Sequence, residues 1–106
     1  MTEKGDLERK FHERMMKIYE QAKLECGYRA NRFRNMVLEM GGLQTAKQLL
    51  STESYSEGLT RLWEEKRLDI SMEATVLQEP WRDLFTKGEL AIAKKKLEEL
   101  GHQSSL

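Results

Sequence analysis

Cysteine, histidine, proline and long apolar runs are all scarce in this chain, and each scarcity excludes a class of protein. The single cysteine, Cys26, cannot form an intramolecular disulfide, so stability has to come from packing, as is typical of a reducing compartment. No apolar run approaches the roughly 20 residues that span a bilayer, and residues 2–6 lack the apolar stretch of a signal peptide. We therefore expect a cytoplasmic protein without a membrane segment.

Patterns of metal-binding and catalytic residues are scarce as well. Apart from carboxylates, the chain offers only His12, His102 and Cys26 as metal ligands, too few for a structural zinc site. His12 and Cys26 belong to one expected helix, where about 21 Å would separate them, so they cannot act as a Cys–His pair. No glycine-rich phosphate loop, Gly-x-Ser-x-Gly elbow or His-Glu-x-x-His pair occurs. We expect no catalytic residues, no metal, no cofactor and no enzymatic activity.

The charged residues that are present balance each other. The chain has 106 residues, enough for one domain with one core, and its 18 basic and 18 acidic side chains cancel. With 39% hydrophobic residues, the composition is far from that of a disordered chain. Residues 1–50 are nevertheless modestly basic and residues 51–106 modestly acidic, an asymmetry that suits self-association or a partner.

Apolar residues recur every three or four positions along most of the chain, which predicts amphipathic helices. The only segment in which a short strand competes is 70–77. We predict an all-α fold, a compact orthogonal bundle of five to six short helices, as a single domain over residues 1–106 with an ordered core over 6–101 and a frayed tail over 102–106. The expected helices run from a cap at Asp6 to Cys26, over 31–40 and 43–50, from a cap at Ser56 to 66, from a cap at Ser71 to before Pro80, and from Thr86 to Leu100.

Three local signals support this prediction. Thr86-x-x-Glu89 is a capping box at the start of the last helix. Gly27 is expected to end the first helix in a left-handed conformation, with Tyr28 folding back onto the last turn. Just before the last helix, a concentrated apolar cluster should anchor that helix to the core, and it consists of Trp81, Leu84 and Phe85.

Two charged runs are expected to lie on solvated helix surfaces. In the first, the basic residues Arg61, Lys66 and Arg67 alternate with acidic residues, so ion pairs are favoured over an acid–base pair; the acidic residues are Glu64, Glu65, Asp69 and Glu73. The second run is Lys94–Lys96, in which the first two lysines can pair with Glu98 and Glu99 one turn later.

A basic segment at the start of the second helix is the best candidate for a binding site. Arginine and asparagine side chains contact phosphates and base edges, and Tyr28 is available to stack on a base; the candidates for nucleic-acid binding are Arg29, Arg32, Arg34 and Asn35. Against this, Phe33 is expected to be buried, only Arg29 and Arg32 share a helical spacing, and exposed arginines commonly just solvate a helix. Both interpretations stay open at this point.

The chain also resembles a family of short bacterial proteins of unknown function over about residues 11–101. The resemblance depends on Tyr19-x-x-Ala22-Lys23, Gly27-Tyr28, Arg32-Phe33, Met36-Val37, Gly41-Gly42, Leu62-Trp63, Arg67-Leu68-Asp69, Glu73, Pro80-Trp81 and Leu84-Phe85-Thr86. Ala30 and His102 depart from the proline and the tyrosine expected there. Members of the family occur alone or attached to larger proteins, some nuclease-like or linked to defence against mobile DNA. The resemblance thus implies an accessory or interaction role and brings no catalytic residues.

The sequence therefore favours a non-enzymatic helical interaction or accessory module that binds a protein partner or a second copy of itself. The charge asymmetry and the lack of any catalytic pattern motivate this hypothesis. A nucleic-acid-binding accessory domain that uses Arg29–Arg34 is the alternative.

Overall fold

Helices dominate the structure, a computed structural model that describes residues 3–102. The all-α prediction is confirmed for these residues, and the segment 70–77, where a strand could have competed, contains a short α-helix over 72–76 and no strand. The expected fraying of the tail falls almost wholly outside the described residues. The elements in chain order are α1 (Glu3–Cys26), α2 (Asn31–Met40), α3 (Gly42–Leu49), α4 (Glu57–Glu64), the 3₁₀ turn η1 (Leu68–Ile70), α5 (Met72–Val76), the 3₁₀ turn η2 (Trp81–Leu84) and α6 (Lys87–Glu99).

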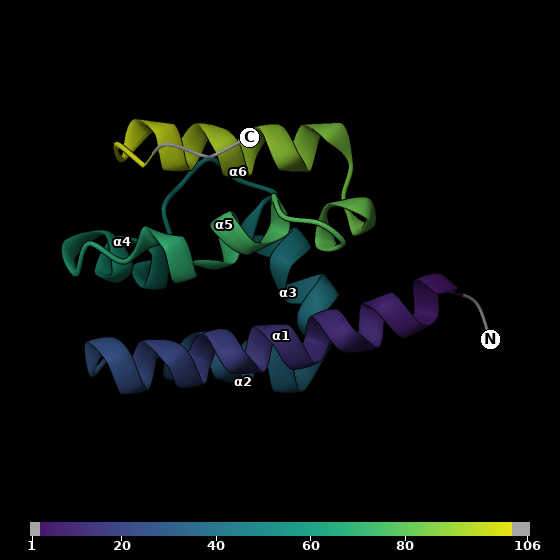
Figure 1. The fold of residues 1–106 in the computed structure, drawn as a ribbon, viewed down its shortest axis with the longest axis horizontal. Helices are drawn as coiled ribbons and strands as arrows, with labels where there is room; N and C mark the ends of the chain where they lie inside the picture. Colours follow the sequence, from purple (N-terminus) through teal and green to yellow (C-terminus); the bar gives the residue numbers. More distant parts are fainter. Residues whose placement is uncertain (1–2, 103–106) are drawn as a thin grey trace.

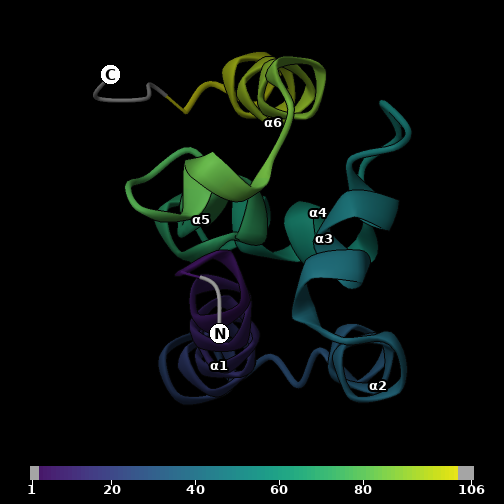
Figure 2. The same cartoon turned by 90° about the vertical axis from the view of Figure 1, so that its right-hand side faces the viewer.

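The helices are arranged in three layers (Figures 1 and 2). Helices α1 and α2 lie side by side in the first layer, and α6 forms the layer on the opposite side of the molecule. Between them lie α3, α4 and α5, with α3 running from the first layer towards α6 (Figure 2). The Cα radius of gyration is 12.8 Å, which matches the roughly 13 Å expected of a compact domain of this length.

Three of the four caps that the sequence indicates set the start of a helix, whereas α2 and α3 begin without a side-chain cap. The hydroxyl oxygens of Ser56, Ser71 and Thr86 each accept a backbone N–H from the first turn of α4, α5 and α6. Glu89 completes the capping box predicted at Thr86. The cap predicted at Asp6 is wrong, because α1 already begins at Glu3. Asp6 lies inside the first turns, where a carboxylate favours the positive end of the helix dipole.

The end of α1 has the predicted geometry. Gly27 has a φ of +65°, and the N–H groups of Gly27 and Tyr28 donate to the carbonyl oxygens of Lys23 and Ala22. This pattern turns the chain sharply back, so that Tyr28 packs against a small apolar cluster of Ala22, Leu62 and Ile70. Helix α1 and the α4–η1 region are thereby joined at this end of the molecule.

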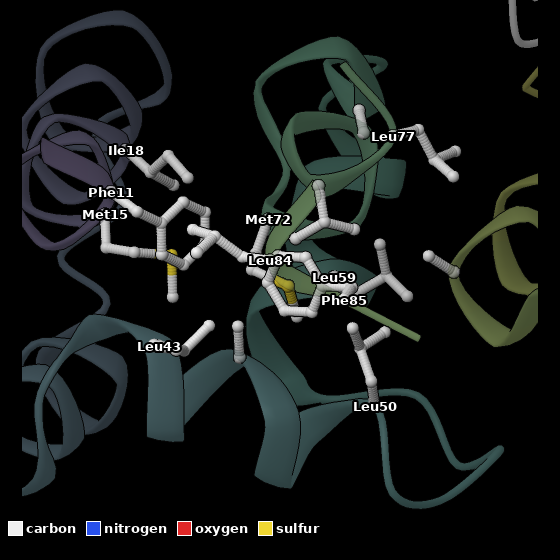
Figure 3. Close-up of a cluster of buried hydrophobic side chains, with 14 of the residues drawn as sticks. Phe11, Met15, Ile18, Leu43, Leu50, Leu59, Met72, Leu77, Leu84 and Phe85 are labelled. Atoms are coloured by element: carbon white, nitrogen blue, oxygen red, sulfur yellow. The ribbon is translucent and has the colours of Figure 1, made fainter. Parts of the chain in front are cut away.

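The main core fills the space between α1, α3, α5 and α6. Figure 3 shows Phe11, Met15 and Ile18 projecting from α1 towards Met72 and Leu84. The predicted anchor before α6 is confirmed, since Leu84 and Phe85 are buried and the rings of Trp81 and Phe85 lie 5.6 and 5.5 Å from the ring of Phe11, centroid to centroid. Edge-on contacts of this kind stabilise aromatic clusters beyond the area they bury.

Candidate functional site

A shallow groove of mixed polar and apolar lining, at one end of the molecule, is the first candidate site. It has a volume of about 330 Å³ and lies where the end of α4, η1 and the residues after α6 meet, with Trp63, Leu68 and Leu100 among its lining residues. Trp63 exposes 46% of its surface, although a tryptophan is among the largest apolar side chains. The groove therefore presents a large aromatic surface beside both leucine and charged side chains.

Backbone strain marks the same groove. Lys66, which lines it, has a φ of +60° and is the only described residue other than glycine with a positive φ. It occupies the position after α4 where a left-handed residue allows the Arg67 N–H to reach the Leu62 carbonyl oxygen, at 2.8 Å. Glycine is usual in this position, because a side chain costs about 1 kcal/mol there. Strain of this kind is common at binding sites.

Arg67 holds the groove in place through two carboxylates. Its guanidinium donates two bonds to Asp69, at 3.0 and 3.1 Å, and one bond of 2.5 Å to Glu25 at the end of α1. These bonds lower the pKa of both carboxyls below their ordinary values. Both carboxylates are thus paired within the fold, although one guanidinium balances only one of the two negative charges. Lys66, also in the groove lining, makes no ion pair with the described residues.

The basic segment does not form one continuous surface. Arg29 precedes α2 in the connecting turn, so the helical spacing expected for Arg29 and Arg32 does not form. Arg32 and Asn35 are exposed on one face of α2, whereas the Arg34 guanidinium lies 5.9 Å from the centre of the Tyr19 ring. The structure thus brings two of the four predicted side chains to one helical face.

The start of α2 is nevertheless suited to an anion. Ala30 provides no side-chain cap, and the first turn contains no acidic residue. Arg29 and Arg32 are exposed and make no ion pair with the residues that the structure describes. The uncapped N–H groups and the positive end of the helix dipole therefore add to these two charges.

Two ionisable residues lie in the core, where the sequence interpretation placed them on the surface. Glu73 and Lys96 are only 2% and 1% exposed, so the expectation of solvated faces is wrong at these two positions. Glu73 belongs to α5, which lies between other elements and is buried on all sides over 71–77. Lys96 follows Ala93 by three residues on α6 and shares its buried stripe.

Only one of these two buried charged groups has a hydrogen-bond partner for each of its buried polar atoms. The Lys96 ammonium donates to the Leu49 carbonyl oxygen at the end of α3, at 3.0 Å, whereas Glu73 Oε2 is buried without a hydrogen-bond partner. Burial raises the pKa of the Glu73 carboxyl and lowers the pKa of the Lys96 ammonium; each group's charge partly opposes the shift of the other. The neighbouring Lys95 also differs from expectation, because it pairs with Glu53 and not with an acidic residue one turn later on α6.

A signal for this pair was present in the sequence. Glu73 stands within the largely apolar run Ile70–Leu77, and Lys96 lies four residues after Ile92 and three after Ala93. The charged residues around both positions made a solvated surface the natural prediction. Which lysine of the run faces the core is decided by tertiary packing, which the sequence pattern does not show.

Searches for other kinds of site are negative over the described residues. Residues 3–102 contain no group of three or more His, Cys, Asp or Glu side chains placed to hold a metal ion. Over the same residues, no helix combines the length and apolarity needed to cross a membrane. In comparisons with protein-family models, curated proteins and solved structures, no match to the chain is found.

Proposed function

We propose that this chain is a protein-interaction module and that the Trp63 groove is its contact surface. The half-exposed indole in a groove that also contains leucine and charged side chains is the observation that carries the proposal. Tryptophan is enriched among the residues that dominate binding energy at protein interfaces, where it fills or walls an apolar pocket. A reducing compartment, as the single cysteine suggests, is part of the same proposal.

The charges of the groove indicate the chemistry of the partner. Asp69 is already paired with Arg67, which leaves Lys66 as the unpaired charge in the lining among the described residues. An apolar side chain in contact with Trp63 and Leu100, flanked by a carboxylate that reaches Lys66, would complement this surface. Retention of a strained lysine where glycine would be more stable fits a role in binding.

Selection from a random peptide library, displayed on phage, tests this proposal against the intact chain. We expect the enriched peptides to combine an aromatic or aliphatic residue with a nearby Asp or Glu. Trp63→Ser should abolish their binding, whereas Leu38→Ser, at an exposed apolar residue of α2, should leave it unchanged. Peptides that bind both variants equally, or a selection without enrichment, would refute the proposal.

Lys66→Gly provides a second readout in the same experiment. Glycine relieves the positive φ, so we expect the free energy of unfolding in urea to rise by about 1 kcal/mol. The same variant should weaken binding of the acidic peptides, because it removes the unpaired ammonium. A gain in stability without loss of binding would show that Lys66 has no part in recognition.

Nucleic-acid binding is the second candidate function, and the start of α2 is the observation that favours it. Its uncapped N–H groups lie next to two arginines without ion-pair partners among the described residues, a combination that fits phosphate oxygens. The segment from Gly27 to Leu38 has no acidic residue, so no internal carboxylate opposes a phosphate there.

Gel-shift titrations at two salt concentrations test the second candidate. Binding should weaken steeply as salt rises, and Arg29→Ala with Arg32→Ala should flatten the logarithmic salt slope by about 2. Lys17→Ala with Lys23→Ala removes the same charge from exposed positions of α1 and should have a smaller effect. Absence of binding at low salt, where phosphate contacts are strongest, would remove this candidate.

A further inference from the structure

A second hollow, separate from the Trp63 groove, lies between the helices α1 to α5. It is a narrow cavity of about 40 Å³ whose walls are largely apolar. A single water molecule needs about 10–15 Å³ measured in this way, so the cavity has room for roughly three water-sized groups. Tyr28, Ser56 and Gly58 are half-buried lining residues, which places one side of the cavity at the surface.

One of the residues that line this cavity, Glu73, has a buried carboxyl group. Glu73 is 2% exposed, and its Oε2 atom has no hydrogen-bond partner. An unpaired oxygen of this kind costs about 1–3 kcal/mol, a penalty that a bound hydrogen-bond donor would remove. Lys96 does not remove it, because its ammonium donates to the Leu49 carbonyl oxygen and makes no ion pair with Glu73. The carboxyl is thus available to a donor from outside the chain.

The walls of the cavity favour a cation as that donor. Three aromatic residues, Tyr19, Tyr28 and Phe33, contribute to the lining, and the faces of aromatic rings attract ammonium groups. Two of these rings already lie near cations, since the Arg34 and Arg61 guanidinium groups lie 5.9 and 5.2 Å from the ring centres of Tyr19 and Tyr28.

The mouth of the cavity does not repel a cation. Arg61 is paired with Glu65, at 3.3 Å, and the Tyr28 hydroxyl donates to Glu57, at 3.2 Å. Together with Arg34, which lies over the Tyr19 ring, these charged side chains around the cavity have no net charge. Quaternary ammonium groups are too wide for a cavity of three water-sized groups, whereas the end of an unbranched alkylamine is not.

We propose that this cavity binds the end of an unbranched alkyl chain that carries a primary ammonium group, with the ammonium donating to Glu73 Oε2 and the methylene groups against the apolar walls. A free alkylamine and the lysine side chain of another protein share this chemistry. The site is distinct from the Trp63 groove, so the proposal stands or falls independently of the proposed function.

Titration of the ¹⁵N-labelled full chain, followed by two-dimensional NMR, tests the site. Propylammonium chloride should cause saturable shifts of the backbone amides of residues 71–74, with a Kd of about 1 mM, as suits a ligand of this size. Tetramethylammonium chloride and 1-propanol should bind at least about tenfold more weakly. A lysine flanked by acetyl and methylamide groups represents the peptide source, and its affinity relative to propylammonium decides between the two sources.

Variants of two glycines control for folding. Gly58 lines the cavity, and a Cβ there would meet only Ser56 Oγ, at 4.0 Å, so Gly58→Met should fold and narrow the cavity. Gly88 occupies the same second position of α6, and a Cβ there meets only Thr86 Oγ1, at 3.9 Å. We expect Gly58→Met to weaken the binding of propylammonium at least about tenfold, and Gly88→Met to leave the affinity for propylammonium unchanged.

Glu73→Gln tests the role of charge. This substitution keeps the size of the side chain. We expect it to weaken the binding of propylammonium by about ten- to a hundredfold, whereas the weak binding of 1-propanol is retained. The proposal is overturned if neither amine causes saturable shifts in the wild-type chain, if 1-propanol binds as tightly as propylammonium, or if Gly58→Met and Gly88→Met bind the amine equally well.

Discussion

Lys96→Met should lower the free energy of unfolding by about 1–3 kcal/mol, the range observed when a buried polar group loses its hydrogen-bond partner. Methionine nearly matches the length of the side chain but lacks the ammonium. The change leaves the Leu49 carbonyl oxygen without its donor and the buried Glu73 carboxyl without the positive charge that favours its ionisation. Urea denaturation at pH 7 measures this loss.

A second substitution shows whether the two groups act together. Glu73→Leu combined with Lys96→Met replaces both charges by apolar groups, an exchange that is often neutral in buried pairs. We therefore expect the double variant to unfold within about 2 kcal/mol of the wild type. Losses that simply add in the double variant would show that Glu73 and Lys96 are independent.

The cost of Lys96→Met should also depend on pH. Because burial raises the pKa of Glu73 above 4.5, the folded chain keeps this proton at a pH where the unfolded chain has released it. This contribution to stability is complete below pH 4.5 and is lost as the pH rises through the folded-state pKa. Without Lys96 the pKa of Glu73 is raised further, so the loss extends to higher pH. A cost that is equal at pH 4 and pH 7 would contradict this coupling.

Much of the fold could be predicted because it depends on local signals. The hydroxyls of Ser56, Ser71 and Thr86 bond to N–H groups three residues away, and Gly27 ends its helix through its own backbone freedom. Such interactions need only a short stretch of sequence. Asp6 failed as a cap because α1 already begins at Glu3, even though Gly5, a poor helix former, directly precedes Asp6.

The candidate sites were harder to predict because they join distant parts of the chain. The Trp63 groove needs residues 63–69 and 100–102 together, and the cavity at Glu73 needs residues from five helices, α1 to α5. Arg29 and Arg32 could be proposed as nucleic-acid-binding residues from the sequence, because they lie close together along the chain. The resemblance to a family of short bacterial proteins stays a prediction, as does the absence of enzymatic activity.

The second large effect is expected at Gly42, where α3 begins against α1. The sequence indicated only a turn at Gly41–Gly42, and Gly41, with a φ of +88°, supplies that turn. Gly42 is needed for a different reason, since a Cβ there would lie 2.7 Å from the Cα of His12 and 3.2 Å from Met15 Cγ. Backbone atoms of α1 cannot yield as a flexible side chain can, so the two helices would have to separate.

Gly42→Ala should therefore destabilise the chain by about 2–4 kcal/mol, as overpacking of a core commonly costs 1–3 kcal/mol and the Gly42 N–H would also lose its 3.0 Å bond to His12 Nδ1. Gly58→Ala is the matched control. Its Cβ has open space in a helix, where alanine is favoured, so it should stabilise by about 0.5–1 kcal/mol. Urea denaturation of both variants measures the difference in their free energies of unfolding. If Gly42→Ala stabilised the chain as Gly58→Ala is expected to, α1 and α3 would not lie as close together as the 2.7 Å contact implies.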